Sequence, residues 1–193
     1  SPTRRTTARR RPVAGGAGGA APAGGAGAFR SVHSAGFPEL LERTGCSVLV
    51  STYQSGRVIV VRARGEELNT HFRFFRSPMG MSLDGTRLAI GTKQSVWTYR
   101  NQPAVAARVE PKGTHDACFM PSTCQVTGDI RIHELVHVGG ELWAANTRFS
   151  CLCTFDGRHS FVPRWRPPFV SRLAAEDRCH LNGLAVADGQ VRF

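Results

Sequence analysis

The chain has 193 residues, with 25 Lys and Arg against 14 Asp and Glu, which gives a formal net charge of +11. This length suits one ordinary domain, and no apolar run of about 18 residues is present to predict a membrane-spanning helix. Hydrophobic residues make up 41% of the chain, which is too many for a wholly disordered protein. The positive charge is unevenly distributed, because residues 1–30 contain six Arg and no acidic residue.

The N-terminal segment differs from the rest in composition. Residues 1–28 contain seven Gly, eight Ala and three Pro, and such a segment cannot offset the entropy lost on ordering. We therefore predict a disordered tail over 1–28 and one globular domain over 29–193. The tail lacks the apolar core of a secretory signal, so we expect a cytoplasmic protein. Arginine-rich tails can contact nucleic acid, but an ordinary solvated tail is the favoured interpretation.

The globular part begins with a short helix or turn over 34–44, with Ser34 as its expected cap. After Gly45 the pattern changes to β-branched runs separated by turns such as Tyr53–Gly56, which is a hairpin signal. No long amphipathic helix interrupts the series. The predicted strands are residues 46–52, 57–63, 69–75, 79–83, 87–92, 96–100, 130–138, 141–147, 149–155, 160–165 and 184–186.

Three segments resemble one another: residues 79–92, 133–147 and 182–193 each contain a strand, a glycine turn and a second strand. Aligning Leu88, Leu142 and Val191 gives offsets of 54 and 49 residues, close to the length of a four-stranded propeller blade. We therefore predict an all-β fold, a partial (truncated) β-propeller of antiparallel four-stranded blades. Another β-sandwich or barrel is the alternative. Truncation is expected because the sequence stops within the second strand of the last hairpin.

Polar side chains cluster where the predicted strands begin or end, which is where rigid β scaffolds carry function. In a propeller, several of them would converge on one axial funnel. Imidazole, carboxylate and amide groups suit a divalent cation such as calcium or general acid–base chemistry, although turn-adjacent carboxylates also bond backbone N–H groups. The candidate ligand-binding residues are His115, Asp116, His133, Glu134, Asn146, Arg148, Asp177, Arg178, His180 and Asn182, and the candidate metal ligands are Asn146 and Asn182.

Two further patterns in the sequence concern metal binding and thiol chemistry. The string from His133 to His137 matches the letters of the HExxH zinc motif, but that motif needs a helix and the flanks here predict strands. The six cysteines form no CxxC pair, which favours free buried thiols in a cytosolic protein. Cys151 and Cys153 are expected to share a strand face without bonding. A reactive thiol at Cys179, beside two basic residues, is the alternative.

The strings NTRFSCL at 146–152 and EDRCHLNGLA at 176–185, with others over about residues 45–193, resemble a bacterial family of uncharacterised conserved proteins that looks like a β-propeller. The resemblance implies a longer domain and supplies no activity. A looser resemblance links the string at 182–185 to six-bladed calcium-dependent lactonases, where an Asn-Gly-Leu string brings an Asn to the metal. It implies a calcium ligand at Asn182, although Leu181 replaces the usual Pro.

The sequence is compatible with three interpretations of function. The preferred interpretation is a module that binds an unknown small molecule or protein partner at the axial funnel. The alternative is a metal-dependent hydrolase of the lactonase type. A nucleic-acid binder is a third interpretation that rests on the basic tail alone, and no nucleic acid is expected to bind elsewhere on the chain.

Overall fold

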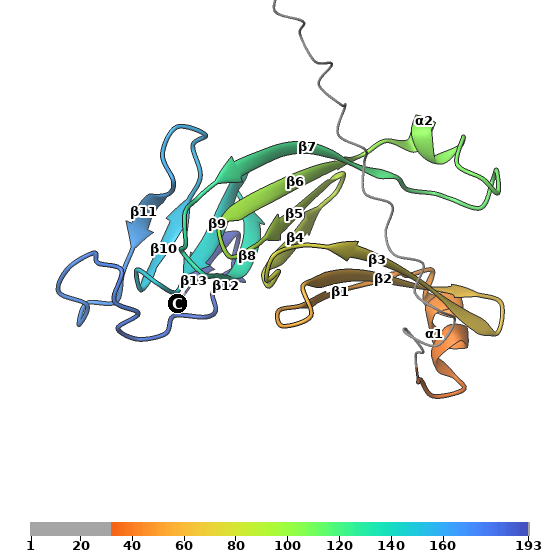
Figure 1. The fold of residues 1–193 in the computed structure, drawn as a ribbon, viewed down its shortest axis with the longest axis horizontal. Helices are drawn as coiled ribbons and strands as arrows, with labels where there is room; N and C mark the ends of the chain where they lie inside the picture. The colour runs from red at the N-terminus through yellow and green to blue at the C-terminus, as the bar shows by residue number, and fades with distance from the viewer. Residues whose placement is uncertain (1–31, 193) are drawn as a thin grey trace, which may run out of the picture. The chain divides into compact units, whose positions relative to one another are not determined.

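The computed structural model describes residues 32–192 (Figure 1). The predicted tail over 1–28 and the predicted boundary at residue 29 lie outside the described residues. One compact unit spans Gly36–Phe193. No helix in the described part of the chain has the length and apolarity that crossing a bilayer requires.

The unit begins with helix α1 (Phe37–Thr44), whose Leu41 is buried. The cap is Gly36 and makes no side-chain hydrogen bond, so the expectation of a Ser34 cap was wrong. The helix starts later than expected because Pro38 stands in its first turn, where a missing N–H leaves no intrahelical bond unmade. It ends at Gly45, whose φ of 62° lies in the left-handed region that glycine adopts readily.

The rest of the unit is a succession of antiparallel sheets in chain order, which confirms an all-β fold. Each sheet is a meander, since neighbouring strands are also neighbours in sequence. The first sheet contains β1 (Val48–Thr52), β2 (Arg57–Arg64) and β3 (Glu67–Phe74), and the second contains β4 (Met81–Asp84), β5 (Arg87–Gly91), β6 (Ser95–Asn101) and β7 (Phe119–Val126). The third sheet contains β8 (Ile132–Val138), β9 (Glu141–Asn146), β10 (Cys151–Thr154) and β11 (Val162–Trp165). The last sheet contains β12 (Ala185–Ala187) and β13 (Gln190–Arg192). A short helix, α2 (Pro103–Ala106), lies between β6 and β7.

The three similar sequence segments occupy equivalent places in this series. Each forms the first hairpin of its sheet: β4 with β5, β8 with β9, and β12 with β13. The glycine turns predicted between the strands join them, so the local pattern identified the hairpins correctly.

Strand β7 was not predicted. Its side chains are mostly exposed, so it lacks the alternation that identifies a half-buried strand. It also contains Pro121, which cannot donate to a ladder and is tolerated on an edge strand. Pro121 lies opposite Tyr99, next to a register shift in the pairing with β6. The pairing partner, rather than the sequence of β7, makes this segment a strand.

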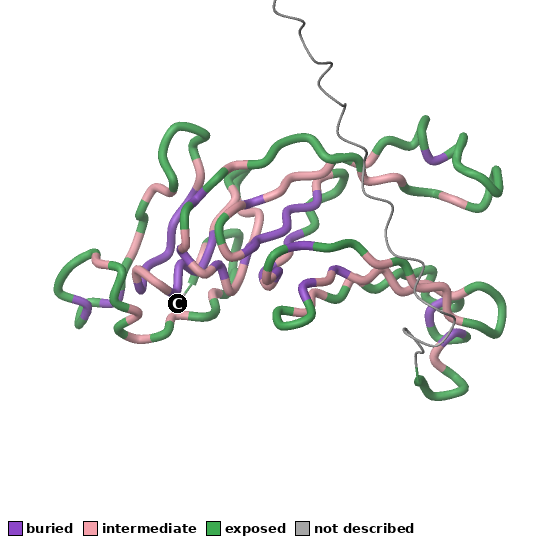
Figure 2. Tube along the Cα trace, viewed as in Figure 1, coloured by how far each residue is buried: buried purple, intermediate pink, exposed green. Residues whose placement is uncertain are grey.

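Two apolar clusters hold successive sheets face to face, and Figure 2 shows the buried segments in the middle of the sheets. The cluster between the first and second sheets contains Val58, Phe75, Leu88 and Ile90. The cluster between the second and third sheets contains Ala89, Val96, Ile130, Ile132, Leu135, Ala144, Cys151 and Cys153, with Phe149 and Phe155 packed against it.

Glycines allow the second and third sheets to approach closely. A Cβ at Gly80 would lie 2.7 Å from the backbone carbon of Glu134, and a Cβ at Gly91 would lie 2.6 Å from Ile132 Cγ2. Both distances are shorter than a normal carbon–carbon contact. Strands β4 and β5 therefore contact β8 directly, and this contact brings the beginnings of the first strands of the two sheets together.

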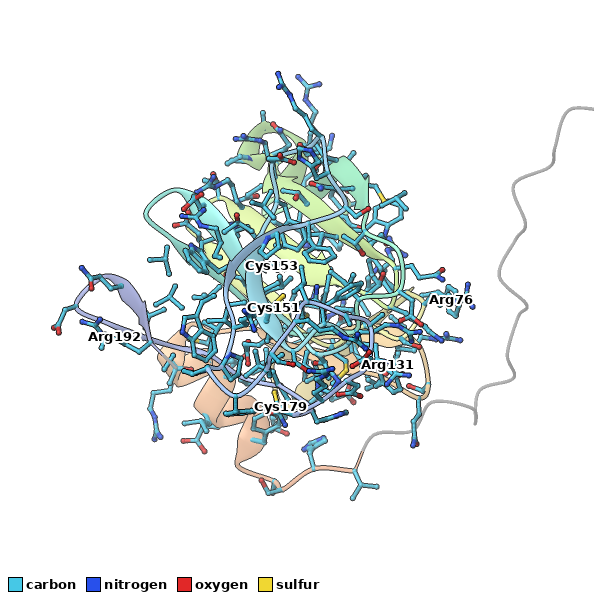
Figure 3. The ribbon with its side chains drawn as sticks, turned by 90° about the vertical axis from the view of Figure 1, so that its left-hand side faces the viewer. Arg76, Arg131, Cys151, Cys153, Cys179 and Arg192 are labelled. Carbon is cyan, nitrogen blue, oxygen red and sulfur yellow. The ribbon has the colours of Figure 1, made fainter. Side chains whose placement is uncertain are left out.

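All six cysteines lie in the described region and are free thiols. Cys151 and Cys153 are fully buried on β10 (Figure 3), so the expectation of two unbonded thiols on this strand is confirmed. Burial raises the pKa of Cys151 to about 12 and raises the pKa of Cys153 as well. A neutral buried thiol is a poor nucleophile, so these two side chains act as small core residues.

Candidate functional site

An open pocket of about 670 Å³ lies where strands of several sheets begin. Met79 precedes β4, Arg131 and His133 flank the beginning of β8, and His180 precedes β12. The turn between β1 and β2 completes the wall. The lining residues are Thr52, Tyr53, Gln54, Ser55, Met79, Arg131, His133 and His180.

Two histidines from distant segments meet in this pocket. The rings of His133 and His180 lie with their centroids 5.0 Å apart, edge to face at 87°. The carboxylate of Asp177 accepts a hydrogen bond from His180 Nδ1, at 3.0 Å from Oδ2. In the neutral imidazole this bond places the proton on Nδ1 and leaves Nε2 as the basic nitrogen.

Asp177 also holds the arginine of the pocket. Arg131 Nη1 donates to Asp177 Oδ2 over 3.1 Å, so one carboxylate orients both a guanidinium and an imidazole. The Asp177 N–H in turn donates to the carbonyl of Arg148, and Arg148 Nη1 pairs with Asp129 Oδ2 at 3.3 Å. The site is therefore tied by polar contacts to the loop that follows β9.

The backbone around the pocket is strained. Left-handed φ values are rare for residues other than glycine and cost about 1–2 kcal/mol each. Six such residues occur in the described chain, and four belong to this region: Arg131 (52°), Ser150 (51°), Asp177 (50°) and His180 (47°). Ser150 belongs to this region because its Oγ accepts a hydrogen bond from the backbone N–H of Arg178, the residue after Asp177, at 2.9 Å. Such strain persists only where the surroundings enforce it, and it concentrates at functional sites.

The electrostatics of the pocket disfavour protonation of His133. Burial is the main cause of its lowered pKa, and the neighbouring His180 and Arg131 add to the effect, while Asp177 opposes it. At neutral pH His133 is therefore an uncharged imidazole beside a guanidinium. Among the residues of the described chain that line the pocket, none is acidic.

The structure distributes the ten residues predicted from sequence over several places. His133 and His180 line the pocket, and Asp177 and Arg148 support it. Arg178 pairs with Glu176 at 2.6 Å and donates to Ser171, next to the pocket wall. Glu134 folds back toward its own strand, since its carboxylate accepts from the Leu135 N–H.

The remaining candidates are not brought to the pocket wall. His115 accepts from Arg62 Nη1 at 3.2 Å, in the connection between β6 and β7, and Asp116 is exposed beside it. Asn146 is fully buried on β9, and Asn182 is exposed before β12. His137, four residues after His133, contacts Ser82 Oγ at 2.8 Å, so the two histidines of the HELVH string have different surroundings.

Asn146 and Asn182 stay a prediction as calcium ligands, and their surroundings differ. In the described region, residues 32–192, His, Cys, Asp and Glu side chains form no group of three that could hold a metal ion. Asn146 uses its Oδ1 to accept from the Phe149 N–H at 3.1 Å, and its Nδ2 is buried without a hydrogen-bond partner. The two candidate metal ligands therefore differ in burial and are not joined by a carboxylate cluster.

Sequence reasoning missed Arg131 and the turn residues Thr52–Ser55. Arg131 stands between Ile130 and Ile132 in the same string as His133, so it was visible as a charge inside an apolar run. The sequence of the turn predicted only a hairpin, because polar residues with hydroxyl and amide side chains are common in turns. Their part in the pocket depends on packing between sheets.

Comparison with known proteins identifies a family without assigning a function. The family described as "Domain of unknown function (DUF4915)" matches residues 35–193. This match confirms the predicted resemblance to an uncharacterised conserved family. Neither the curated proteins nor the solved structures gave a match to the chain.

Proposed function

The chain belongs to this family of unknown function, and we propose that it binds a small anionic ligand in the pocket of Arg131, His133 and His180. The observation that carries the proposal is the convergence of one guanidinium and two imidazoles on a wall whose described lining residues include no acid. The bound group would be a phosphate or a carboxylate, since guanidinium geometry matches both.

Charge and hydrogen-bonding capacity support an anion. A guanidinium has five N–H donors, and the contact with Asp177 uses Nη1. The Tyr53 hydroxyl and the Gln54 amide are further donors among the lining residues. The pair Thr52–Ser55 is already joined by a hydrogen bond of 2.5 Å between the two hydroxyl oxygens, which pre-orients part of the pocket wall.

We further propose that the pocket is the axial funnel of a partial β-propeller. The second and third sheets are successive four-stranded meanders that pack face to face, which is the arrangement of propeller blades. Four of the lining residues lie before or at the start of β4, β8 and β12, and the other four lie at the end of β1 and in the turn that follows it. Six free cysteines favour a reducing compartment, which supports the proposed cytoplasmic location.

The proposal is tested by titrating the full chain with inorganic phosphate and, separately, with acetate. Binding is measured by calorimetry and by the NMR shifts of the imidazole C–H protons. An anion beside His133 raises the pKa of its ring and favours uptake of a proton, so binding should tighten as pH falls from 7.5 to 6. The two anions distinguish a phosphate site from a carboxylate site.

A matched pair of variants assigns the binding to this pocket. Arg131→Gln removes one charge-assisted contact, worth about 1.5–3 kcal/mol, and should weaken binding about tenfold or more. Gln carries the same backbone strain as Arg at this position, so the backbone is not relieved. Arg100→Gln, on the exposed surface of β6, should leave binding unchanged. Equal affinity in the two variants, or phosphate shifts confined to other histidines, would contradict the proposal.

A further inference from the structure

The structure contains an arrangement that anion binding by itself does not need. Asp177 contacts His180 Nδ1 through both of its oxygens, at 3.1 and 3.0 Å. A carboxylate that holds Nδ1 in this way directs the lone pair of Nε2 away from itself, and His180 lines the pocket. This is the geometry of an oriented general base.

We infer that the Asp177–His180 pair makes this pocket a metal-independent hydrolase for uncharged carboxylic esters or lactones, with water as the second substrate. The inference rests on the proposed binding pocket. It differs from the lactonase interpretation because the base is an imidazole of this chain and no calcium site is required.

The electrophilic part of the site is Arg131. Its guanidinium shares Asp177 with His180, so the base and the cation are held by the same carboxylate and open onto one cavity. A pocket that prefers an anion binds an uncharged ester weakly and binds the oxyanion of the tetrahedral intermediate well. Interactions that strengthen only as charge develops are those that accelerate a reaction.

The backbone supports this assignment independently of the side-chain contacts. Arg131, Asp177 and His180, which would hold the three principal roles, all have left-handed φ values near 50°. A purely structural ion pair on loops does not require strained backbone at each member. Strain at all three residues indicates that the polar contacts around Asp177 hold them in place.

Water attacks the carbonyl carbon and gives its proton to His180 Nε2, while the carbonyl π electrons move to oxygen, where Arg131 stabilises the negative charge. His133, uncharged at neutral pH and 5.0 Å from His180 between ring centroids, is placed to donate a second hydrogen bond. The oxyanion then collapses, the ester C–O bond breaks, and the proton on Nε2 passes to the leaving alcohol oxygen. The products are a carboxylic acid and an alcohol.

The test uses the full chain with p-nitrophenyl acetate and an unsubstituted δ-lactone, in buffer containing EDTA. Saturable turnover is expected, and His180→Asn should lower kcat/KM by about 100-fold, the usual contribution of a general base. Asn tolerates left-handed φ, and the side chain of His180 is 58% exposed, so the variant should fold normally. Asp177→Asn should also lower turnover, because it no longer favours the Nδ1–H form.

Chemical rescue separates a base from a structural residue. In His180→Gly, added imidazole should restore turnover, which a merely structural role would not allow. His115→Asn, at a histidine outside the pocket, is the matched control and should retain full activity. Phosphate should inhibit the parent protein competitively, because it occupies the position of the oxyanion.

The outcomes discriminate between the two ideas. Phosphate binding without saturable ester hydrolysis would overturn this inference and leave the binding proposal intact. Loss of both would overturn both. Turnover that His180→Asn does not reduce, or that EDTA abolishes and calcium restores, would also overturn it.

Discussion

Gly80 and Gly91 set the distance between the second and third sheets, and replacing them tests that packing directly. A Cβ at position 80 would meet three backbone atoms of Glu134 and Leu135 at 2.7–2.9 Å. Normal contacts between such atoms begin near 3.5 Å, so β4 and β8 would have to separate by roughly 0.7 Å. Backbone atoms cannot rotate away, and the displacement would open the apolar cluster beneath.

We expect Gly80→Ala to destabilise the protein by about 3 kcal/mol, the upper part of the range for overpacked cores. For a chain of this size that corresponds to a fall in Tm of about 6–12 °C. Gly91→Ala meets the side chain of Ile132 at 2.6 Å instead, which can adjust in part, so about 2 kcal/mol is expected. Truncating Ile132 to Ala should reduce the additional effect of Gly91→Ala, because the two positions are coupled.

The control is Gly183→Ala, where a Cβ would meet nothing within 4 Å and the φ is not left-handed. That variant should be neutral or stabilising by up to about 1 kcal/mol, because alanine restricts the unfolded chain. Urea unfolding, with Cm compared at a common m-value, measures the four single variants and the Gly91→Ala/Ile132→Ala double variant. If Gly80→Ala unfolds within 0.5 kcal/mol of Gly183→Ala, the close approach of the two sheets is not as described.

Two further predictions concern titration and thiol reactivity. The free energy of unfolding should fall as pH decreases below about 6.5, because histidines with a folded-state pKa below the unfolded value bind protons preferentially in the unfolded state. His137→Gln should flatten this dependence, measured by urea unfolding at pH 7.5, 6.5 and 5.5. A free energy of unfolding that rises on acidification would contradict the prediction. The histidines with lowered pKa are His71, His133 and His137, each lowered mainly by burial. Maleimide labelling of the native protein at pH 7.5 should modify the exposed Cys46 and Cys124. Cys151 and Cys153 should remain unlabelled until urea is added, as measured by mass spectrometry of the digested protein. Rapid labelling of Cys153 in the native protein would refute its burial.

The sequence alone predicted most of the strands and their hairpin partners. Apolar runs next to glycine turns predict strands β5 and β9, and both strands lie within two residues of their expected limits. Hairpins are local, so turn chemistry and side-chain alternation are sufficient to place them. The similarity of three segments likewise predicted three equivalent hairpins before any packing was known.

The candidate site was only partly predictable for a different reason. His133 and His180 could be selected as polar residues at strand ends, but their contact joins segments 47 residues apart in sequence. Nothing local distinguishes them from His115, which the fold places against Arg62 instead. Arg131 was overlooked because it stands in a strand-like run, where a charge is usually an exposed edge residue.

Local patterns of a few residues therefore determine the secondary structure of this protein, whereas the packing of the sheets against one another determines the pocket. The pairing of β7 to β6, the approach of β8 to Gly80 and Gly91, and the sharing of Asp177 by Arg131 and His180 all depend on residues distant in sequence. Their free energies arise from burial and complementary charge, which exist only once the chain has packed. For this reason the sequence determined the hairpins, and only the tertiary structure decided which polar side chains share a site.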